Sequence, residues 1–454
     1  MLRGRRAEIR IGAGRTFLRD RVLWIVIAVA FSLRLAVVAG NARVTPDGLD
    51  YSQAAQNILH GNGFSLSAHA PFIPCTIRDP LYSVLVAAVY GVLGVHALPV
   101  YLLQICCSLV AVVVVYCMAL HYFGLLAARV TAALGAFHIG SIVWVADLVT
   151  ETLYITLLLA GCWLFVGPAG RWPTGRRCAG VVLLAAATLT RSEAALFCAG
   201  LILICTLAGS WRWPALKRAF LFLLLWLVPI SPWLVRNFAH SHRVFLRDPN
   251  VMIAAVSVSL SNDFSDPSYA AVFQHPGGMS GEEAASHWKR IRERLRSEWS
   301  DGRADFVCQR LVRLTDAWIS PPGRMKVFGG TFFDTFTVIG PLLANGRYGE
   351  AIGRAALYLL FGVIPLLTCC AAAAWLWRSA PDTRWLLWYP AYISAISLVV
   401  YADRRYSLAG QYFLMPFLGW ALSVPWRSHG VGASAAVGKP SQPNTEGMDG
   451  VPAV

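Results

Sequence analysis

Hydrophobic runs of helix-spanning length recur along this chain of 454 residues. A helix needs about 20 mostly apolar residues to cross a bilayer. The runs do not alternate apolar with polar residues, as the strands of a membrane barrel would. We therefore predict an all-α polytopic membrane protein with about ten transmembrane helices plus in-plane helices. The predicted spans are 22–40, 97–120, 125–145, 151–166, 178–190, 194–209, 217–235, 351–377, 385–401 and 408–426.

The charged residues of the chain are few, and the basic ones lie where membrane topology predicts them. Only 14% of the residues are charged, against roughly 25% in soluble domains. The formal net charge of +15 includes an arginine-rich segment, 1–21, directly before the first hydrophobic run. Positive residues of this kind remain in the cytoplasm. We therefore expect a basic cytoplasmic tail rather than a cleaved signal peptide, and no nucleic-acid partner.

The apolar run 80–95 decides the topology, because its length is marginal for a span. If it crosses, the basic loops 171–177 and 211–218 lie outside. If it is an in-plane or re-entrant helix, both loops lie inside, as the positive-inside rule favours. We adopt the second topology, in which both chain ends are cytoplasmic. The exported segments are then 41–79, 236–350 and 402–407.

This topology divides the chain into five parts. A first transmembrane module and a second set of helices flank a large exported region, and a polar tail ends the chain. The tail is rich in Gly, Ser, Ala and Pro, so we expect it to be disordered. The parts are the basic tail 1–21, the module 22–235 with its exported loop 41–79, the exported soluble region 236–350, the C-terminal transmembrane helices 351–426, and the cytoplasmic tail 427–454.

The first exported loop begins with two acids in the run Pro-Asp-Gly-Leu-Asp-Tyr. If Asp47 opens a helix, Asp50 and Tyr51 share one helical face with it. Gly61 and Gly63 then end that helix. An acid at a membrane surface can act on a substrate whose leaving group is anchored in the membrane.

Further acids stand at the exported ends of later runs. Asp147 and Glu151 lie one helical turn apart, and acids at this depth are usually functional or paired. Alternatively, Glu151 with Thr150 forms a helix N-terminus. Arg191 and Glu193 interrupt two apolar helices, where they either pair with each other or leave Arg191 to bind a phosphate.

Arginines at the exported face oppose the positive-inside trend. Arg404 and Arg405 stand in the last exported turn, and guanidinium groups bind phosphate through two hydrogen bonds. The alternative is that Asp403 pairs with one of them and the turn only shapes the loop. Arg78 precedes the in-plane helix, where it either faces lipid phosphates or extends along the membrane interface.

Cysteine usage predicts no metal site. Most of the 11 cysteines lie inside apolar runs, where they act as small apolar residues. No Cys-x-x-Cys or His-paired spacing typical of a metal occurs. Cys75 and Cys308 are both exported in this topology, so a disulfide between them is one alternative and two free thiols the other. We expect no required cofactor.

These landmarks, taken in order, resemble those of the GT-C superfamily of membrane glycosyltransferases. The branch of bacterial protein O-mannosyltransferases and lipid A aminoarabinose transferases is most similar. Residues 47–63 resemble its first-loop pattern of an acid, a tyrosine four residues on and a Gly-x-Gly stop. Residues 78–82 resemble an Arg-Pro-Pro-Leu-Tyr element, with Asp79 replacing a proline. Residues 151–153 resemble the second acidic site.

The later landmarks extend the resemblance over nearly the whole chain. Residues 189–193 are similar to a Leu-Thr-Arg-Pro-Glu turn, with Ser192 replacing the proline. Residues 232–237 match Pro-Trp-x-x-Arg-Asn, and Arg405-Tyr406 is similar to a late Arg-Tyr element. Each motif alone is weak, but together they form an ordered set on one predicted membrane face.

The resemblance implies a glycosyltransferase that moves a sugar from a polyprenyl-phosphate donor to an acceptor hydroxyl with inversion. The acceptor would be a glycan, lipid or protein, and the site would face outward from a bacterial inner membrane. Asp47 would be the general base, with Asp50 assisting, and Glu151 would orient acceptor or sugar. The orienting residues would further include Tyr51, Tyr82, Asp147 and Tyr406, and the donor-phosphate ligands Arg404, Arg405, Arg78, Arg191 and Arg236.

Some relatives use a divalent metal at paired acids, although nothing in this sequence demands one. Two other functions remain open. A flippase for polyprenyl-linked glycans would need arginines along a path through the membrane. Here only Arg34 and Arg129 lie near span centres. A ligase that uses pyrophosphate-linked glycans would place its charged residues on the same face.

Overall fold

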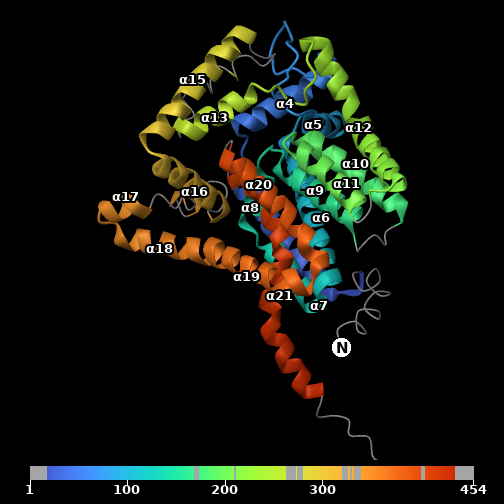
Figure 1. Cartoon of the computed structure of the whole chain (residues 1–454), viewed down its shortest axis with the longest axis vertical. Coiled ribbons are helices and arrows are strands. Elements are labelled where there is room, and N and C mark those ends of the chain that lie inside the picture. The colour runs from blue at the N-terminus through green and yellow to red at the C-terminus, as the bar shows by residue number, and fades with distance from the viewer. Residues whose placement is uncertain are drawn as a thin grey trace, which may run out of the picture.

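The computed structural model describes residues 18–167, 173–208, 211–261, 272, 280–319, 326–327, 330–331, 339–399 and 404–434. Helices make up almost all of this part of the chain (Figure 1). Its strands are the two-residue antiparallel pair β1 (Lys326–Val327) and β2 (Gly330–Thr331). The predicted all-α membrane architecture is therefore confirmed.

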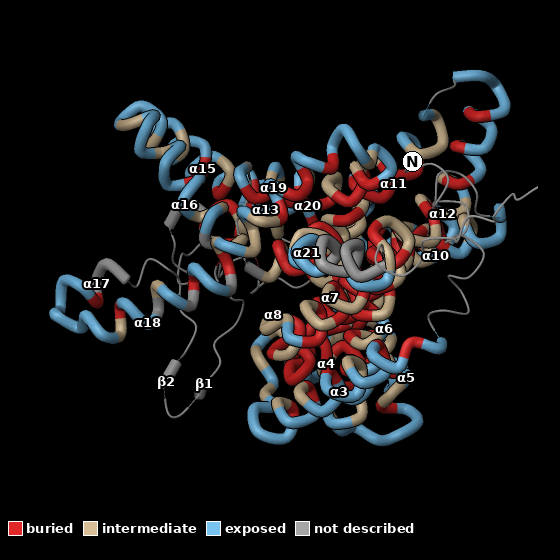
Figure 2. Tube along the Cα trace, turned by 90° about the horizontal axis from the view of Figure 1, so that it is seen from below, coloured by how far each residue is buried: buried red, intermediate tan, exposed pale blue. Residues whose placement is uncertain are grey.

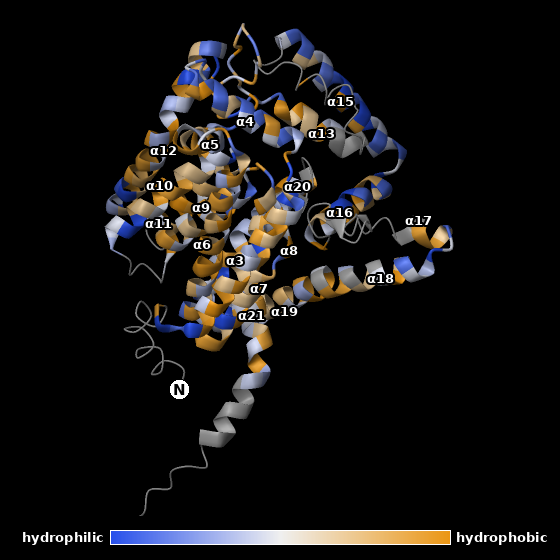
Figure 3. Ribbon diagram, turned by 180° about the vertical axis from the view of Figure 1, so that it is seen from behind, coloured by the Kyte–Doolittle hydropathy of each residue, from blue (hydrophilic) through white to orange (hydrophobic). Residues whose placement is uncertain are grey.

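Apolar helices form the body of the molecule, and Figure 3 shows hydrophobic residues concentrated on them. Within the described residues, α3 (Arg21–Asn41), α6 (Ala97–Phe123) and α12 (Trp213–Ser241) are long and apolar enough to cross a membrane. A fourth candidate joins α7 (Leu125–Ala136) to the segment Ile139–Ala146 across a 48° bend. The predicted count of about ten spans is not confirmed.

Several of the predicted spans form helices that are shorter than a typical membrane span. The apolar runs after the fourth candidate form α9 (Glu151–Val166), α10 (Thr174–Thr190) and α11 (Ala194–Leu207), of which α9 and α11 have 16 and 14 residues. Their length alone does not identify them as spans. The helices from residue 303 onward are α16 (Arg303–Ile319), α17 (Ile339–Ala344), α18 (Tyr348–Tyr358), η3 (Leu359–Val363), α19 (Ile364–Ser379), η4 (Pro381–Leu387), α20 (Trp388–Val399) and α21 (Arg404–Ser434).

The largest buried core joins α6, α7, α9, α10 and α21, and Figure 2 shows buried residues gathered there. Glycines let these helices approach closely. A Cβ atom on Gly180 of α10 would lie 2.6 Å from the backbone nitrogen of Phe165 in α9. One on Gly419 of α21 would lie 2.9 Å from the Ala127 carbonyl oxygen in α7. Larger side chains at either position would force the helices apart.

A second group of helices covers one end of this bundle (Figure 1). It contains α4 (Pro46–Leu59), α5 (Pro80–Leu93), α13 (Val251–Ser261) and α15 (Gly281–Asp301). The Thr45 hydroxyl caps α4 by accepting from the Gly48 N–H, and Pro46 occupies its first turn. Gly61 and Gly63 follow with φ of 77° and 74°, which favours glycine. The predicted start and end of this helix are confirmed.

Three further predictions concern this end of the bundle and the tail. Helix α5 has 14 residues and packs against α4, and its in-plane orientation stays a prediction. Cys75 is buried and Cys308 is exposed, and both thiols are free. In the predicted tail 427–454, residues 435–454 lie outside the described part of the chain, and the preceding ones continue α21.

The two arginines near span centres stabilise the bundle. Arg34 is fully buried and donates to the Ser108 hydroxyl in α6 at 2.8 Å and to the Ala136 carbonyl oxygen at the end of α7 at 3.0 Å. Arg129 in α7 donates to both carboxylate oxygens of Asp20 at 2.9–3.1 Å. Both side chains therefore connect helices.

Replacing Asp20 by alanine should lower the free energy of unfolding by about 2 kcal/mol. The Asp20 carboxylate caps α3 through the Val22 N–H and accepts hydrogen bonds from Arg129 and Tyr116. Thermal unfolding in detergent measures the loss. The control is Asp382→Ala, at an exposed position in η4. Equal losses in the two variants would contradict the stabilising role of the Asp20 contacts.

Candidate active site

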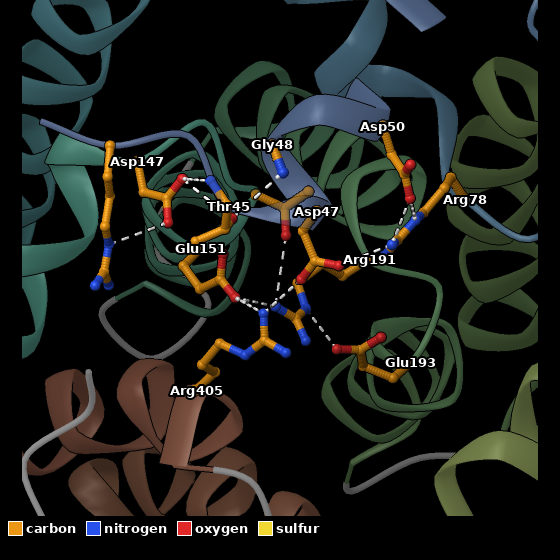
Figure 4. Close-up of polar contacts among 12 residues, drawn as sticks. Thr45, Asp47, Gly48, Asp50, Arg78, Asp147, Glu151, Arg191, Glu193 and Arg405 are labelled. Carbon is orange, nitrogen blue, oxygen red and sulfur yellow. Dashed lines mark hydrogen bonds and ion pairs between the residues drawn. The ribbon is translucent and has the colours of Figure 1, made fainter. Parts of the chain in front are cut away.

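Acidic and basic side chains alternate in one contiguous cluster at the end of the bundle where α4 lies (Figure 4). We call it the charge cluster. Its members come from α4, the segment before α5, the start of α9, the turn between α10 and α11, and the start of α21. They are Asp50, Arg78, Asp47, Arg405, Glu151, Arg191 and Glu193.

Asp47 lies at the centre of the charge cluster, in the first turn of α4. Its Oδ1 accepts from Arg78 Nη2 at 2.7 Å, and its Oδ2 accepts from Arg405 Nη1 at 2.8 Å. Burial raises the pKa of the Asp47 carboxyl, but Arg78 and Arg405 outweigh it and hold the pKa well below its usual range. The side chain remains 30% exposed. Asp47 is therefore an accessible carboxylate at neutral pH.

Asp50 and Tyr51 lie on the face of α4 that the sequence predicts. The Asp50 Oδ2 accepts from both Nε and Nη2 of Arg78, at 3.1 and 2.7 Å. The Arg78 guanidinium lies 5.5 Å from the centre of the Tyr51 ring, which packs edge-on against Tyr82. Burial raises the pKa of Tyr51 to about 12, so this ring stays neutral. Tyr51 thus contacts the Arg78 guanidinium, and Tyr82 in turn packs against Tyr51.

Glu151 begins α9 and is only 3% exposed. Its Oε1 accepts from Arg191 Nη1 at 3.0 Å and lies 3.7 Å from Arg405 Nη1. Arg191 also donates to Glu193 and lies 4.8 Å from the centre of the Tyr406 ring. Glu151 therefore connects the turn that carries Arg191 to the start of α21.

The two departures from the family landmarks contact each other. The Asp79 Oδ2 accepts from the backbone N–H of Ser192 at 3.1 Å and from its hydroxyl at 3.3 Å. Burial raises the pKa of Asp79 to about 6, although nearby Arg247 opposes the shift. Arg247 lies 3.6 Å from Asp79 and 3.7 Å from Glu193. These contacts extend the charge cluster toward the segment after α12.

Asp147 lies beside the charge cluster and anchors the start of α4. Its Oδ1 accepts from the backbone N–H and the hydroxyl of Thr45 at 3.1 and 3.2 Å. The Arg43 Nε lies 3.6 Å from its other oxygen. Because Thr45 caps α4, Asp147 helps to position the helix that carries Asp47.

Arg236 does not join the charge cluster. Its guanidinium donates to the carbonyl oxygens of Cys75 at 2.6 Å and Phe64 at 3.0 Å, and it stacks on Trp233. These contacts shape the loop before α5. Its predicted phosphate contact stays a prediction.

The predicted phosphate ligand Arg404 and the question of a metal site complete the comparison with the sequence. Arg404 is the first residue of α21, but its side chain and the neighbouring Asp403 are outside the described part of the chain. In that part, no group of three or more His, Cys, Asp or Glu side chains is placed to hold a metal ion. Every carboxylate of the charge cluster instead faces an arginine.

Sequence reasoning missed Arg247. It is one of two arginines in the segment between α12 and α13, and nothing in the local sequence distinguishes it from Arg243. Only the fold shows that it lies against Asp79 and Glu193.

Comparisons with known proteins concern the family and the fold. Residues 74–235 match the family model for dolichyl-phosphate-mannose-protein mannosyltransferase. None of the curated proteins matches the chain. The matched range contains Arg78, Glu151 and Arg191, whereas Asp47 and Arg405 lie outside it.

Among solved structures, the chain is similar to the oligosaccharyltransferase of Archaeoglobus fulgidus with a tethered acceptor peptide. The identity is 14% and the TM-score 0.52, over 92% of this chain and 51% of that one. ArnT from Cupriavidus metallidurans bound to undecaprenyl phosphate matches with 16% identity and a TM-score of 0.39, over 92% and 81% of the two chains. The chain thus has the fold of the GT-C membrane glycosyltransferases that its landmarks indicate.

Proposed function

We propose that this chain transfers a sugar from a polyprenyl-phosphate donor to an acceptor hydroxyl, with Asp47 as general base and inversion at the sugar. The reaction takes place at the extracytoplasmic face of a bacterial inner membrane. The observation that carries the proposal is the position of Asp47 between Arg78 and Arg405. A proton acceptor and two phosphate-binding groups meet at one accessible point.

Arg78 and Arg405 suit the donor phosphate because each guanidinium presents paired N–H donors to an oxyanion. Their side chains are 16% and 31% exposed, so a phosphate can reach them, while the partial exclusion of water strengthens a charge interaction. When the bond between sugar and phosphate breaks, negative charge develops on the phosphate. Guanidinium groups already in place stabilise that charge without reorganisation.

Donor binding also prepares Asp47 as a base. In the free protein the two arginines hold the pKa of Asp47 low, which makes the carboxylate a weak proton acceptor. A phosphate on Arg78 and Arg405 offsets their positive field, so the pKa of Asp47 rises. The base is therefore strongest when the donor is bound, and the acceptor hydroxyl loses its proton only then.

An apolar cavity of about 590 Å³ provides room for part of the donor's hydrocarbon chain. It lies between α7, α19 and α21, and it begins on α21 at Gln411, about two turns beyond Arg405. Burying hydrocarbon there is favourable by about 25 cal/mol per Å². Its apolar lining includes Leu134, Phe137, Leu366, Leu414, Leu418 and Leu422.

The matched family model supports this donor class, since its description names dolichyl-phosphate-mannose, a sugar linked through phosphate to a polyprenyl lipid. A flippase would need charged groups free to contact a moving head group through the membrane. Arg34 and Arg129 instead make contacts that connect helices. The placement of the accessible charges at one end of the bundle favours an enzyme.

Purified protein should release polyprenyl phosphate from one or more radiolabelled polyprenyl-phosphate sugars when a membrane extract supplies acceptors. The same sugars on polyprenyl pyrophosphate serve as the comparison. Turnover of pyrophosphate donors alone would overturn the proposal in favour of a glycan ligase. Movement of intact donor across vesicles without bond cleavage would indicate a flippase.

Asp47→Asn should reduce turnover by about 10²- to 10⁴-fold while expression and donor binding persist. The amide keeps the shape of the side chain but cannot accept the proton. Transfer assays and donor-binding titrations measure the two effects separately. Asp382→Asn, at an exposed position in η4, is the control. Near-normal transfer by Asp47→Asn, with Asp50→Asn inactive, would move the base to Asp50.

Arg405→Ala should raise the apparent donor KM and lower turnover, each by about tenfold or more. Arg405→Lys should recover only part of the loss, because lysine keeps the charge without the planar fork. The comparison is Arg384→Ala, at an arginine of η4 that donates to the Trp377 carbonyl oxygen away from the charge cluster and should leave the donor KM nearly unchanged. Equal effects of the two alanine variants on donor KM would contradict the assignment of Arg405.

The pH profiles should separate the free and donor-bound states of Asp47. The low pKa of Asp47 keeps the free protein's base ionised, so the acid limb of kcat/KM should lie at low pH. Activity is lost as the pH falls through that pKa. The acid limb of kcat should lie about one unit or more higher, because bound phosphate raises the pKa. Coincident limbs would contradict this coupling.

Asp79 is a second titrating group in this region, with its pKa raised to about 6. The profiles should therefore be repeated in Asp79→Asn. A limb near pH 6 that disappears in this variant belongs to Asp79, and a limb that persists belongs to Asp47 or another group.

A further inference from the structure

Trp144, in the short 3₁₀ helix η1 (Trp144–Ala146), lies between two of the charge pairs at the site. The Arg405 guanidinium lies 5.7 Å from its ring centre, and that of Arg43 lies 5.9 Å away. Arg405 pairs with Asp47, and Arg43 pairs with Asp147. One indole ring thus contacts two arginines, each of which pairs with a different acid.

Trp144 and Glu151 both line a small cavity of about 10 Å³. Both side chains are more than nine-tenths buried. Within the described residues, the Trp144 Nε1 and the Glu151 Oε2 are buried polar atoms without a hydrogen-bond partner. The other oxygen of Glu151 accepts from Arg191. A buried polar atom without a hydrogen-bond partner is unfavourable, so these two atoms need a partner.

The size and chemistry of this cavity fit one water molecule. A cavity of about 10–15 Å³ holds a single water that needs two to four polar partners. An indole N–H only donates and a carboxylate oxygen only accepts, so one water can accept from the first and donate to the second. Ser108 and Tyr412 also line the cavity, but their hydroxyls already bind Arg34 and Ser141, so the two atoms without partners are the ones left for the water.

We propose that this cavity binds one ordered water, which bridges the Trp144 indole to the free oxygen of Glu151. Trp144 is then a positioning residue. It acts on Glu151 through the water and on Arg405 through its ring face. With both oxygens bound, the Glu151 carboxylate holds a single orientation toward the site. The effect on transfer rests on the function proposed above, whereas the water site itself does not.

The first test is a structure of the wild-type protein, at a resolution that shows buried waters. Density should appear in the cavity within hydrogen-bond distance of both Trp144 Nε1 and Glu151 Oε2. Density for other buried waters, with none at this position, would overturn the proposal. A direct hydrogen bond between the two side chains would overturn it as well.

The second test is Trp144→Phe, which keeps a ring for the two arginines but removes the N–H donor. The water should lose occupancy, and turnover should fall about tenfold with the donor KM unchanged. Trp385→Phe is the matched control, because it removes another buried indole hydrogen bond, to Tyr122 at 2.9 Å, away from the site. Equal turnover in the two variants would overturn the positioning role even if the water is present. If wild-type protein turns over no donor, the proposed transferase function is wrong. The electron density in the cavity then still tests whether the water is bound there.

Discussion

The pairing of one carboxylate with two guanidinium groups organises this end of the protein. Arg78 follows Asp47 by 31 residues and Arg405 follows it by 358. Charges removed from water are stable only when opposite charges and hydrogen bonds surround them. Each arginine therefore also faces a second acid, Asp50 or Glu151. This alternation avoids like-charge contacts and fixes α4, the start of α9 and the start of α21 relative to one another.

A hydrogen-bonded pair replaces two prolines in this arrangement. Proline restricts φ and would stiffen a turn without any partner. Asp79 and Ser192 instead hold the turn through hydrogen bonds to one carboxylate oxygen. Since the neighbouring Arg191 connects that turn to Glu151, the geometry of the charge cluster depends on a group whose pKa is about 6. The surrounding Arg247 and Glu193 set how strongly the turn responds to protonation.

Local features were predictable from the sequence, and long-range ones were not. Helix α4 and the shared face of Asp47 and Asp50 follow from caps and helical spacing, which are properties of neighbouring residues. Hydropathy shows where apolar runs lie but not which of them span, so the count of about ten spans stays a prediction. Trp144 is one of 17 tryptophans, and Arg247 one of many arginines. Only tertiary packing distinguishes them.

The separation of Asp47 and Arg405 along the chain also bears on how the protein is made. Chains are synthesised from the N-terminus, and their early parts begin to fold first. Asp47 and Arg78 can meet early, but Arg405 enters only with α21, the last helix of the described chain. A nascent or truncated polypeptide therefore holds an incomplete charge cluster and an incomplete cavity beside it. The site can therefore be complete only after α21 has been synthesised and has packed against the earlier helices.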